Sequence, residues 1–307
     1  MRNTFSKKIT QYADKGEDFT ILSADLGYSV FDDFRKKYPE KFFNAGIAEN
    51  TMVGVAAGLA MAGKKVFIYS ISKFLANKCF EHIREDICYH DVPVVMVGTG
   101  SGFSYGQAGH SHYSNEDIGC LRAIPGLTIV SPIDPTELEV LLDQSLTYPH
   151  PVYFRLGKNG EQCFSKKLNL KIGQAYYLEK EKDIALITHG NIIDEVAKAR
   201  DLLKKDGFNV SIISSPTIKP LDKKFFEELM RDHANLYVIE EHSEIGGLGD
   251  ALAYLGAKKI AVKDEAFYKC GDPHYLRKMS GLNAEAIYLR VKKETSLKMM
   301  SAVSKNL

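Results

Sequence analysis

Strand-length apolar runs alternate with helix-like stretches along most of the chain, and this alternation constrains the fold more than any other feature. In the first half the runs are FTILSA (19–24), KFFNA (41–45), KVFIYS (65–70), VPVVMVG (92–98), LTIVS (127–131) and PVYFRL (151–156). Helical candidates lie between them, near 30–38, 49–62, 77–89 and 136–146. Nearly continuous apolar strands that alternate with helices are typical of a parallel sheet covered on both faces. The sequence therefore predicts an α/β fold.

The apolar pattern lapses between Gly157 and Leu170 and then resumes in a second unit. Its strand candidates are 183–190, 209–214, 235–240 and 258–262, and its helical candidates are 191–206, 222–233, 247–255 and a stretch from about 283. Two prolines in PTIKPLD (216–222) block a helix until Asp222, which we expect to be an N-cap. We therefore expect two doubly wound domains with mainly parallel sheets, residues 1–165 and a smaller unit of residues 166–307.

Composition excludes several classes of partner. The net charge of +1 gives no reason to expect a nucleic acid or a membrane surface. The N-terminal stretch lacks the apolar core of a signal peptide and is typical of an amphipathic helix. The five cysteines form neither a CxxC pair nor a metal-ligand spacing. We expect a cytoplasmic protein whose cysteines remain reduced.

A single acid, Glu49, stands in NAGIAENTMVGVAAGLAMAG (44–63), ahead of an uncharged stretch that extends to Gly63. An acid at a helix N-terminus is favoured by the helix dipole by ~0.3–1 kcal/mol, which would be an ordinary role. However, Gly54 and Gly58 fall inside the same predicted helix, where each glycine costs up to ~1 kcal/mol relative to alanine. Such glycines suggest that another backbone or a ligand approaches closely. Glu49 is then a candidate for proton transfer in a poorly solvated place.

Several segments together resemble a known family. The Glu49 segment resembles the glutamate-bearing part of the pyrimidine-binding domain in transketolase-like thiamin diphosphate enzymes. SADL (23–26) matches a segment near the start of that domain, and the stretch GQAGHSHYSNEDIG that begins at Gly106 resembles the second transketolase signature. PTIKPLD and the stretch IEEHSEIGGLGDALA that begins at Ile239 resemble the transketolase C-terminal domain. The resemblance implies transfer of a two-carbon ketol unit from a ketose to an aldose acceptor.

The resemblance also implies roles for cofactor-binding residues. Glu49 would hydrogen-bond the pyrimidine ring of thiamin diphosphate and drive the tautomeric shift that activates the cofactor. Phe74 would stack on that ring, and Tyr69 is a weaker candidate that also fits the core. Ile47 would contact the cofactor beside Glu49.

Substrate-binding residues follow from the same resemblance. His112, in Gly109-His110-Ser111-His112, falls where the family has an active-site histidine that exchanges protons with substrate oxygens. Arg155 in YFRLGK would bind a sugar phosphate, with Ser23 as a small donor. His110 is either a second substrate contact or a surface residue.

The chain departs from the family pattern at two positions. Transketolases usually carry a phosphate- and hydroxyl-binding histidine where this chain has Gly100, and an acid where it has Ala108. These losses leave cofactor activation intact but put ordinary pentose phosphate substrates in doubt. A different sugar, nucleotide-linked or otherwise modified, is therefore a hypothesis.

A third departure is the absence of the Gly-Asp-Gly motif and downstream Asn that hold the Mg²⁺ and diphosphate in full-length transketolases. The chain therefore resembles the C-terminal subunit of a split enzyme. We expect an N-terminal transketolase subunit to supply the Mg²⁺ ligands, in an α2β2 assembly with the active site between chains. We expect the isolated chain to bind the cofactor poorly and to show no turnover.

Two alternatives share parts of this interpretation. One is the β subunit of a 2-oxo-acid dehydrogenase decarboxylase or a deoxyxylulose phosphate synthase-like enzyme. The other is a non-catalytic structural subunit. The second unit shows no convincing catalytic set and is expected to serve assembly, with His242 as a structural hydrogen bonder.

Overall fold

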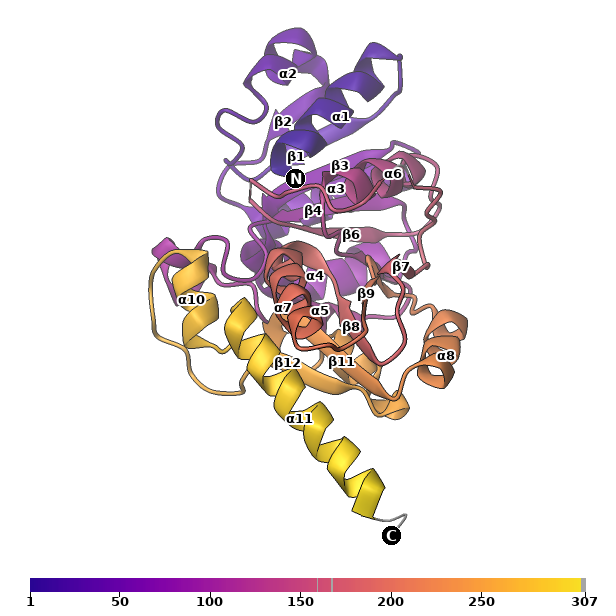
Figure 1. Cartoon of the computed structure of the whole chain (residues 1–307). Coiled ribbons are helices and arrows are strands. Elements are labelled where there is room, and N and C mark those ends of the chain that lie inside the picture. The colour runs from indigo at the N-terminus through magenta and orange to yellow at the C-terminus, as the bar shows by residue number, and fades with distance from the viewer. Residues whose placement is uncertain (159, 167, 305–307) are drawn as a thin grey trace.

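Two sheets form the frame of the molecule (Figure 1), whose computed structural model describes residues 1–158, 160–166 and 168–304. The larger sheet has, in spatial order, the strands β10 (Thr217–Lys219), β5 (Thr128–Val130), β6 (Val152–Leu156), β4 (Val94–Thr99), β3 (Val66–Ile71), β1 (Thr20–Ser23) and β2 (Phe42–Asn44). The smaller sheet has β12 (Lys258–Val262), β11 (Asn235–Ser243), β8 (Ile184–Thr188), β9 (Val210–Ser214) and β7 (Tyr176–Glu179). Only β10 and β7 pair antiparallel within these described sheets, so the predicted fold class is confirmed.

Helices cover both sheets. In the first unit they are α1 (Arg2–Asp14), α2 (Asp32–Lys37), α3 (Glu49–Met61), α4 (Phe80–His82), α5 (Asp117–Arg122) and α6 (Pro135–Ser145). In the second they are α7 (Ile193–Lys205), α8 (Lys223–Asp232), α9 (Leu248–Ala251), α10 (Pro273–Met279) and α11 (Ala284–Ser304). Two π-helical segments flank α4: η2 (Phe74–Lys78) and η3 (Ile83–Cys88). Within the described residues, no helix combines the length and apolar character that crossing a membrane requires.

The apolar strands lie between two cores, as their composition predicts. Every residue of β3, β4 and β6 is buried. One core packs α3 against one face of the sheet, and the other packs α1 and α6 against the opposite face. A third core lies under α7 and α11 in the second unit. Because both faces of the central strands are covered, these strands show no polar alternation.

The second unit reaches back into the first sheet. The strand β10 follows β9 in the chain, yet it pairs antiparallel with β5 at the edge of the larger sheet. After β10 the chain enters α8, and the Asp222 side chain accepts a hydrogen bond from the Phe225 backbone N–H at 3.2 Å. The predicted N-cap is therefore confirmed, whereas β10 itself was not predicted.

Candidate active site

Asn44 determines how the chain enters α3. Its amide oxygen accepts hydrogen bonds from the backbone N–H groups of Asp25 (2.9 Å) and Gly46 (3.0 Å). Its amide nitrogen donates to the Asp25 carboxylate at 2.8 Å. Gly46 has a φ of 72°, a conformation that glycine adopts without strain. The turn after β2 is therefore tightly held, and Glu49 becomes the first residue of α3.

Glu49 is only 3% exposed, although it lies at a helix end. Its carboxylate accepts a hydrogen bond from the Lys78 Nζ at 2.5 Å, and the Lys78 side chain is 51% exposed. The next residue, Asn50, contacts the Cys79 Sγ at 3.3 Å through its amide oxygen. Burial raises the pKa of Cys79 to about 12, so this thiol remains protonated and unreactive. Glu49 thus lies at the start of α3 and faces η2, with the half-exposed Lys78 ammonium beside its carboxylate.

The outer face of α3 is uncovered by the described residues. The inner face packs into the core through Met52, Ala56 and their neighbours. On the outer face Val55 is 47% exposed, and a Cβ added at Gly58 would meet no atom within 4 Å. Ile47, which precedes the helix, is 80% exposed. The small residues of α3 therefore leave an open apolar surface beside Glu49.

A closed loop brings His112 to Phe74. Gly102 and Ser114 exchange backbone hydrogen bonds of 3.1 and 3.0 Å and close this loop at its base. The His112 ring lies 5.1 Å from the Phe74 ring, and its Nδ1 lies 3.0 Å from the Ser111 hydroxyl. Phe74 belongs to η2, the segment that also carries Lys78. The structure therefore places Phe74 beside His112, and η2 links this pair to Glu49 through Lys78 at its other end.

Three other predicted residues lie elsewhere. Tyr69 is 1% exposed and packs between the rings of Phe5 and Phe31, at 5.9 and 4.9 Å, on the sheet face opposite α3. It is a core residue, so the cofactor contact predicted for it is not available. Ser23 is buried and its hydroxyl donates to the Leu26 carbonyl at 2.9 Å. His110 is exposed, with its ring 6.4 Å from that of Tyr268.

Arg155 has a different role from the predicted phosphate contact. It is 1% exposed, and its Nε donates to the Asp117 carboxylate at 2.8 and 3.1 Å. Its Nη2 donates to the carbonyl oxygens of Ser114 (2.7 Å) and Glu241 (3.1 Å). Burial alone would raise the pKa of Asp117, but the Arg155 charge outweighs it and the pKa lies below its usual value. Arg155 is therefore a structural residue that joins the two units.

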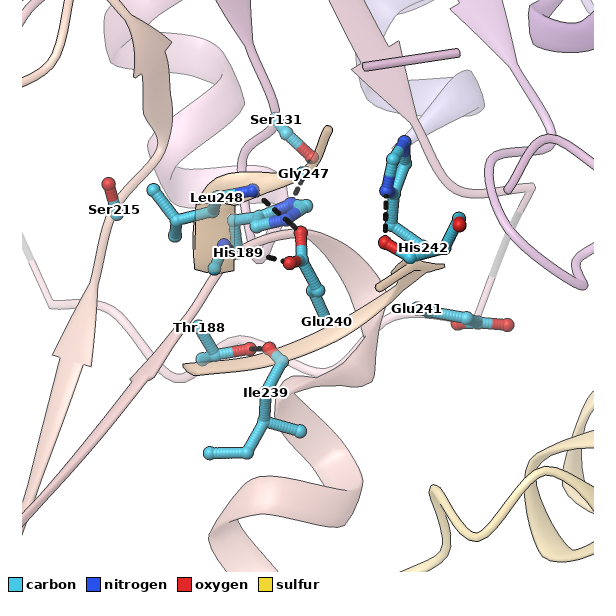
Figure 2. Close-up of polar contacts among 12 residues, drawn as sticks. Ser131, Thr188, His189, Ser215, Ile239, Glu240, Glu241, His242, Gly247 and Leu248 are labelled. Carbon is cyan, nitrogen blue, oxygen red and sulfur yellow. Dashed lines mark hydrogen bonds and ion pairs between the residues drawn. The ribbon is translucent and has the colours of Figure 1, made fainter. Parts of the chain in front are cut away.

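Arg155 belongs to a buried polar cluster, here called the interdomain seam, and of its other members only His242 was predicted from the sequence. In Figure 2, His189 lies between Ser131 of the first unit and Glu240 of the second, with its ring nitrogens 3.0 and 3.3 Å from their oxygens. The Glu240 carboxylate also accepts from the Leu248 and Gly249 backbone N–H groups at 2.9 and 2.8 Å. Two adjacent acids at the end of the apolar run NLYVIEE are the signal that points to such a cluster.

The neighbours of Glu240 complete the seam. Glu241 accepts from the Phe103 backbone N–H at 2.8 Å and from Arg277 at 2.7 Å. His242 accepts from the Gly119 backbone N–H at 3.1 Å, so its predicted structural role is confirmed. The consecutive residues Glu240, Glu241 and His242 therefore each hold a different segment at the boundary between the units.

The corner around Glu49 fits one end of a thiamin cofactor. It offers a shielded carboxylate, an aromatic ring and an exposed aliphatic residue, which suit a flat heterocycle with a ring nitrogen. Among the described residues, no group of three or more His, Cys, Asp or Glu side chains is arranged to hold a metal ion. The roles of Glu49, Phe74 and Ile47 toward the pyrimidine end and the source of Mg²⁺ ligands in a partner both remain predictions.

Comparisons with known proteins agree with this arrangement. Residues 1–160 match the model of the transketolase pyrimidine-binding domain, and residues 173–287 match the transketolase C-terminal domain. A putative transketolase C-terminal section from Methanocaldococcus jannaschii is 34% identical, with 96% of each chain covered. One subunit of an apulose-4-phosphate transketolase from Actinobacillus succinogenes is 32% identical over 94% of this chain and 96% of the relative.

A solved structure has the same fold over nearly its whole length. It is described as a split gene transketolase, an inactive β4 tetramer, and is 29% identical with a TM-score of 0.87. The alignment covers 97% of this chain and 98% of the solved one. From these matches and the geometry around Glu49, we conclude that the chain belongs to the transketolase family and comprises its pyrimidine-binding and C-terminal domains.

Proposed function

We propose that this chain is the C-terminal subunit of a heteromeric, thiamin diphosphate-dependent transketolase. In this role it takes part in moving a two-carbon ketol unit from a ketose to an aldose. The observation that carries the proposal is the placement of Glu49. Its carboxylate is shielded from water at the start of α3, beside an apolar surface that the described chain leaves uncovered.

Each residue near Glu49 has a specific task in this proposal. When bound, thiamin diphosphate supplies the electron sink for cleaving a carbon–carbon bond. Glu49 holds a proton at a pyrimidine nitrogen, and Phe74 and Ile47 position the ring. His112 donates or accepts a proton at an oxygen of the sugar substrate. Because Lys78 now bonds Glu49, its ammonium must give way when the pyrimidine arrives.

A second subunit completes the site in this proposal. Such a subunit would contribute the diphosphate domain with its Mg²⁺ ligands and would cover the outer face of α3, and two copies of each chain would form an α2β2 complex. Support comes from the relatives, of which one is named as a transketolase subunit and another as a C-terminal section. The solved relative made of β chains alone is described as inactive.

The first test measures ketol transfer by the assembled complex. We expect Glu49→Gln to lower kcat by about 10²–10⁴-fold, the range typical of losing a proton-transfer residue. Glu81→Gln is the matched control, because Glu81 is an exposed acid on α4 close to the same segment. The control should retain the rate of the unmodified complex. Size-exclusion chromatography of both variants checks that assembly is intact.

Different outcomes identify the alternatives. A Glu49→Gln complex with an unchanged rate would show that the chain is a non-catalytic structural subunit. Release of CO₂ from a 2-oxo acid, without transfer of glycolaldehyde units, would instead favour a decarboxylase β subunit or a deoxyxylulose phosphate synthase-like enzyme. Full turnover by the isolated chain would contradict the need for a partner.

A further inference from the structure

A cavity of about 450 Å³ lies between the two units, close to the candidate active site. From the first unit it is lined by the loop 104–108 and by residues just after β6, including Lys158 and Glu161. From the second unit it is lined by Asn191 in the turn before α7, by Asp194 in the first turn of α7, and by α10. We call it the interdomain pocket. The sequence analysis assigned no role to these residues of the second unit.

Tyr105 connects the interdomain pocket to the candidate active site. Its side chain belongs to the pocket lining, and its ring lies 6.4 Å from the ring of His112. His112 in turn lies 5.1 Å from Phe74. The pocket therefore begins one side chain beyond His112. A sugar that reaches His112 with its reacting end can extend past Tyr105 into the pocket.

Tyr105 also occupies the place of a side chain that transketolases usually have. Gly100 stands where the family has a histidine that binds phosphate and hydroxyl groups. A Cβ added at Gly100 would lie 1.9 Å from the Tyr105 ring, so no larger residue fits there while the ring is in place. At Gly100 the chain therefore presents the aromatic surface of Tyr105.

The pocket is rich in hydrogen-bond acceptors that have no donor. The Oδ1 of Asp194, the Oδ1 of Asn191 and the Oε1 of Glu161 are buried and have no hydrogen-bond partner within the described residues. A buried oxygen without a partner is destabilising, so a ligand that brings donors would relieve it. Burial raises the pKa of Asp194 above its usual value, which is a further sign of poor solvation.

Arg277, the arginine that lines the pocket, is already engaged. Arg277 donates to the Glu241 carboxylate at 2.7 Å and to the Asn191 carbonyl at 3.2 Å. The Lys158 ammonium lies 4.8 Å from the centre of the Tyr105 ring. A phosphate dianion here would meet the Asp194 carboxylate, beside a Glu161 carboxylate that is paired with the Met1 ammonium, and would bring no donor of its own. Sugar hydroxyl groups, in contrast, can donate to all three acceptors.

We propose that the interdomain pocket binds the far, hydroxyl-bearing end of an unphosphorylated sugar, and that Asp194 is a specificity-determining residue contributed by the second unit. This inference rests on the proposed function, because it assigns the substrate class of the same active site. It distinguishes this chain from its relative named for apulose-4-phosphate, a phosphorylated sugar.

The first measurement is sugar binding to the full chain, because every lining residue belongs to it. D-Ribose and D-xylulose, each with and without a 5-phosphate, are titrated and followed by ligand-observed NMR. We expect the free sugars to bind more tightly than their 5-phosphates. Asp194→Ala should weaken binding of the free sugars about tenfold, because one charged acceptor is lost. Asp201→Ala, an exposed acid on the same helix, should leave binding unchanged.

A second variant keeps the test decisive if Asp194→Ala fails to fold. Ala108 is exposed and lines the pocket, so Ala108→Trp should fill the space and abolish sugar binding without changing the thermal midpoint. Tighter binding of the 5-phosphates, no detectable binding of the free sugars, or full binding by both variants would overturn the proposal.

Activity of the assembled complex separates this proposal from the previous one. We expect kcat/KM for free D-ribose as acceptor to exceed that for ribose 5-phosphate, and Asp194→Ala to reverse this preference. Robust turnover of xylulose 5-phosphate with ribose 5-phosphate would support the proposed function and overturn the pocket assignment. Asp194-dependent sugar binding without any ketol transfer would support the pocket assignment and overturn the proposed function.

Discussion

The interdomain seam and the corner around Glu49 both contain buried acids, but the acids differ in the partners that the chain provides for them. At the seam, Arg155 and Glu241 are fully buried, and each has protein partners from both units. At the corner, Glu49 has the half-exposed Lys78 as its ion-pair partner, next to the open face of α3. The chain thus completes its internal boundary by itself, whereas the corner around Glu49 borders a helix face that the described residues leave open. Three predictions address this contrast.

The largest effect is expected from breaking the seam. Arg155→Met leaves the Asp117 carboxylate buried without its partner, which typically costs about 3–5 kcal/mol of unfolding free energy. Arg290→Met is the matched control, because Arg290 forms an exposed pair with Glu294 one turn along α11. The control should change stability by less than about 0.5 kcal/mol. Urea denaturation of both variants measures the difference.

The same variant tests the role that the sequence analysis predicted for Arg155. If Arg155 served substrate binding, Arg155→Met would keep the unfolding midpoint and raise only the KM for a phosphorylated sugar. A midpoint equal to that of the control would therefore contradict the structural role.

An intermediate effect is expected from acid. Burial alone would raise the pKa of Glu240, but hydrogen bonds from His189 and Gly249 outweigh it and lower the pKa from 4.5 to about 2. Folding is then favoured by the ionised form, so this stabilisation is present above pH 4.5 and is lost as the pH falls toward 2. The shift corresponds to about 3 kcal/mol.

Glu240→Gln should remove this part of the pH dependence. Unfolding midpoints measured between about pH 2 and pH 6 should fall less steeply for Glu240→Gln than for the unmodified chain. Glu228→Gln, an exposed acid on α8, should follow the unmodified chain. Identical slopes for Glu240→Gln and Glu228→Gln would show that Glu240 does not stabilise the seam through its charge.

The smallest effect is expected at the accessible corner. Lys78→Met removes the ammonium that competes with the pyrimidine for Glu49, so the assembled complex should bind thiamin diphosphate roughly two- to fivefold more tightly. Lys73→Met is the control, because Lys73 pairs with Glu116 at 3.1 Å on the same stretch. Isothermal titration calorimetry measures both. Weaker cofactor binding by Lys78→Met than by the control would mean that Lys78 assists the cofactor.

The sequence predicted the elements that are buried at every position. Strands such as β3 and β4 are buried at all their residues, so continuous apolar runs sufficed to locate them. The strand β10 was missed because it has only three residues and follows a proline. The helix expected at 77–89 exists as two π-helical segments around α4, and nothing in local periodicity distinguishes those hydrogen-bonding patterns.

In the candidate site, too, some residues could be predicted from the sequence and others could not. Glu49 could be selected because an isolated acid next to a run of small residues is unusual within one segment. The environment of Arg155 could not be predicted, because it depends on Asp117, which lies 38 residues away. The contact between Gly100 and Tyr105 could not be predicted either, because a glycine in a loop does not show which side chain will lie against it.

The strand β10 has a consequence for how such a protein can be divided. Cutting the chain near residue 165 would strip the outermost strand from the first sheet and leave β5 with an unpaired edge, the kind that invites aggregation. The two units are therefore interlocked: each has its own sheet, but one hydrophobic core contains buried residues of both. A fragment that carries the first unit alone should therefore precipitate, because β5 loses the strand that covers its edge.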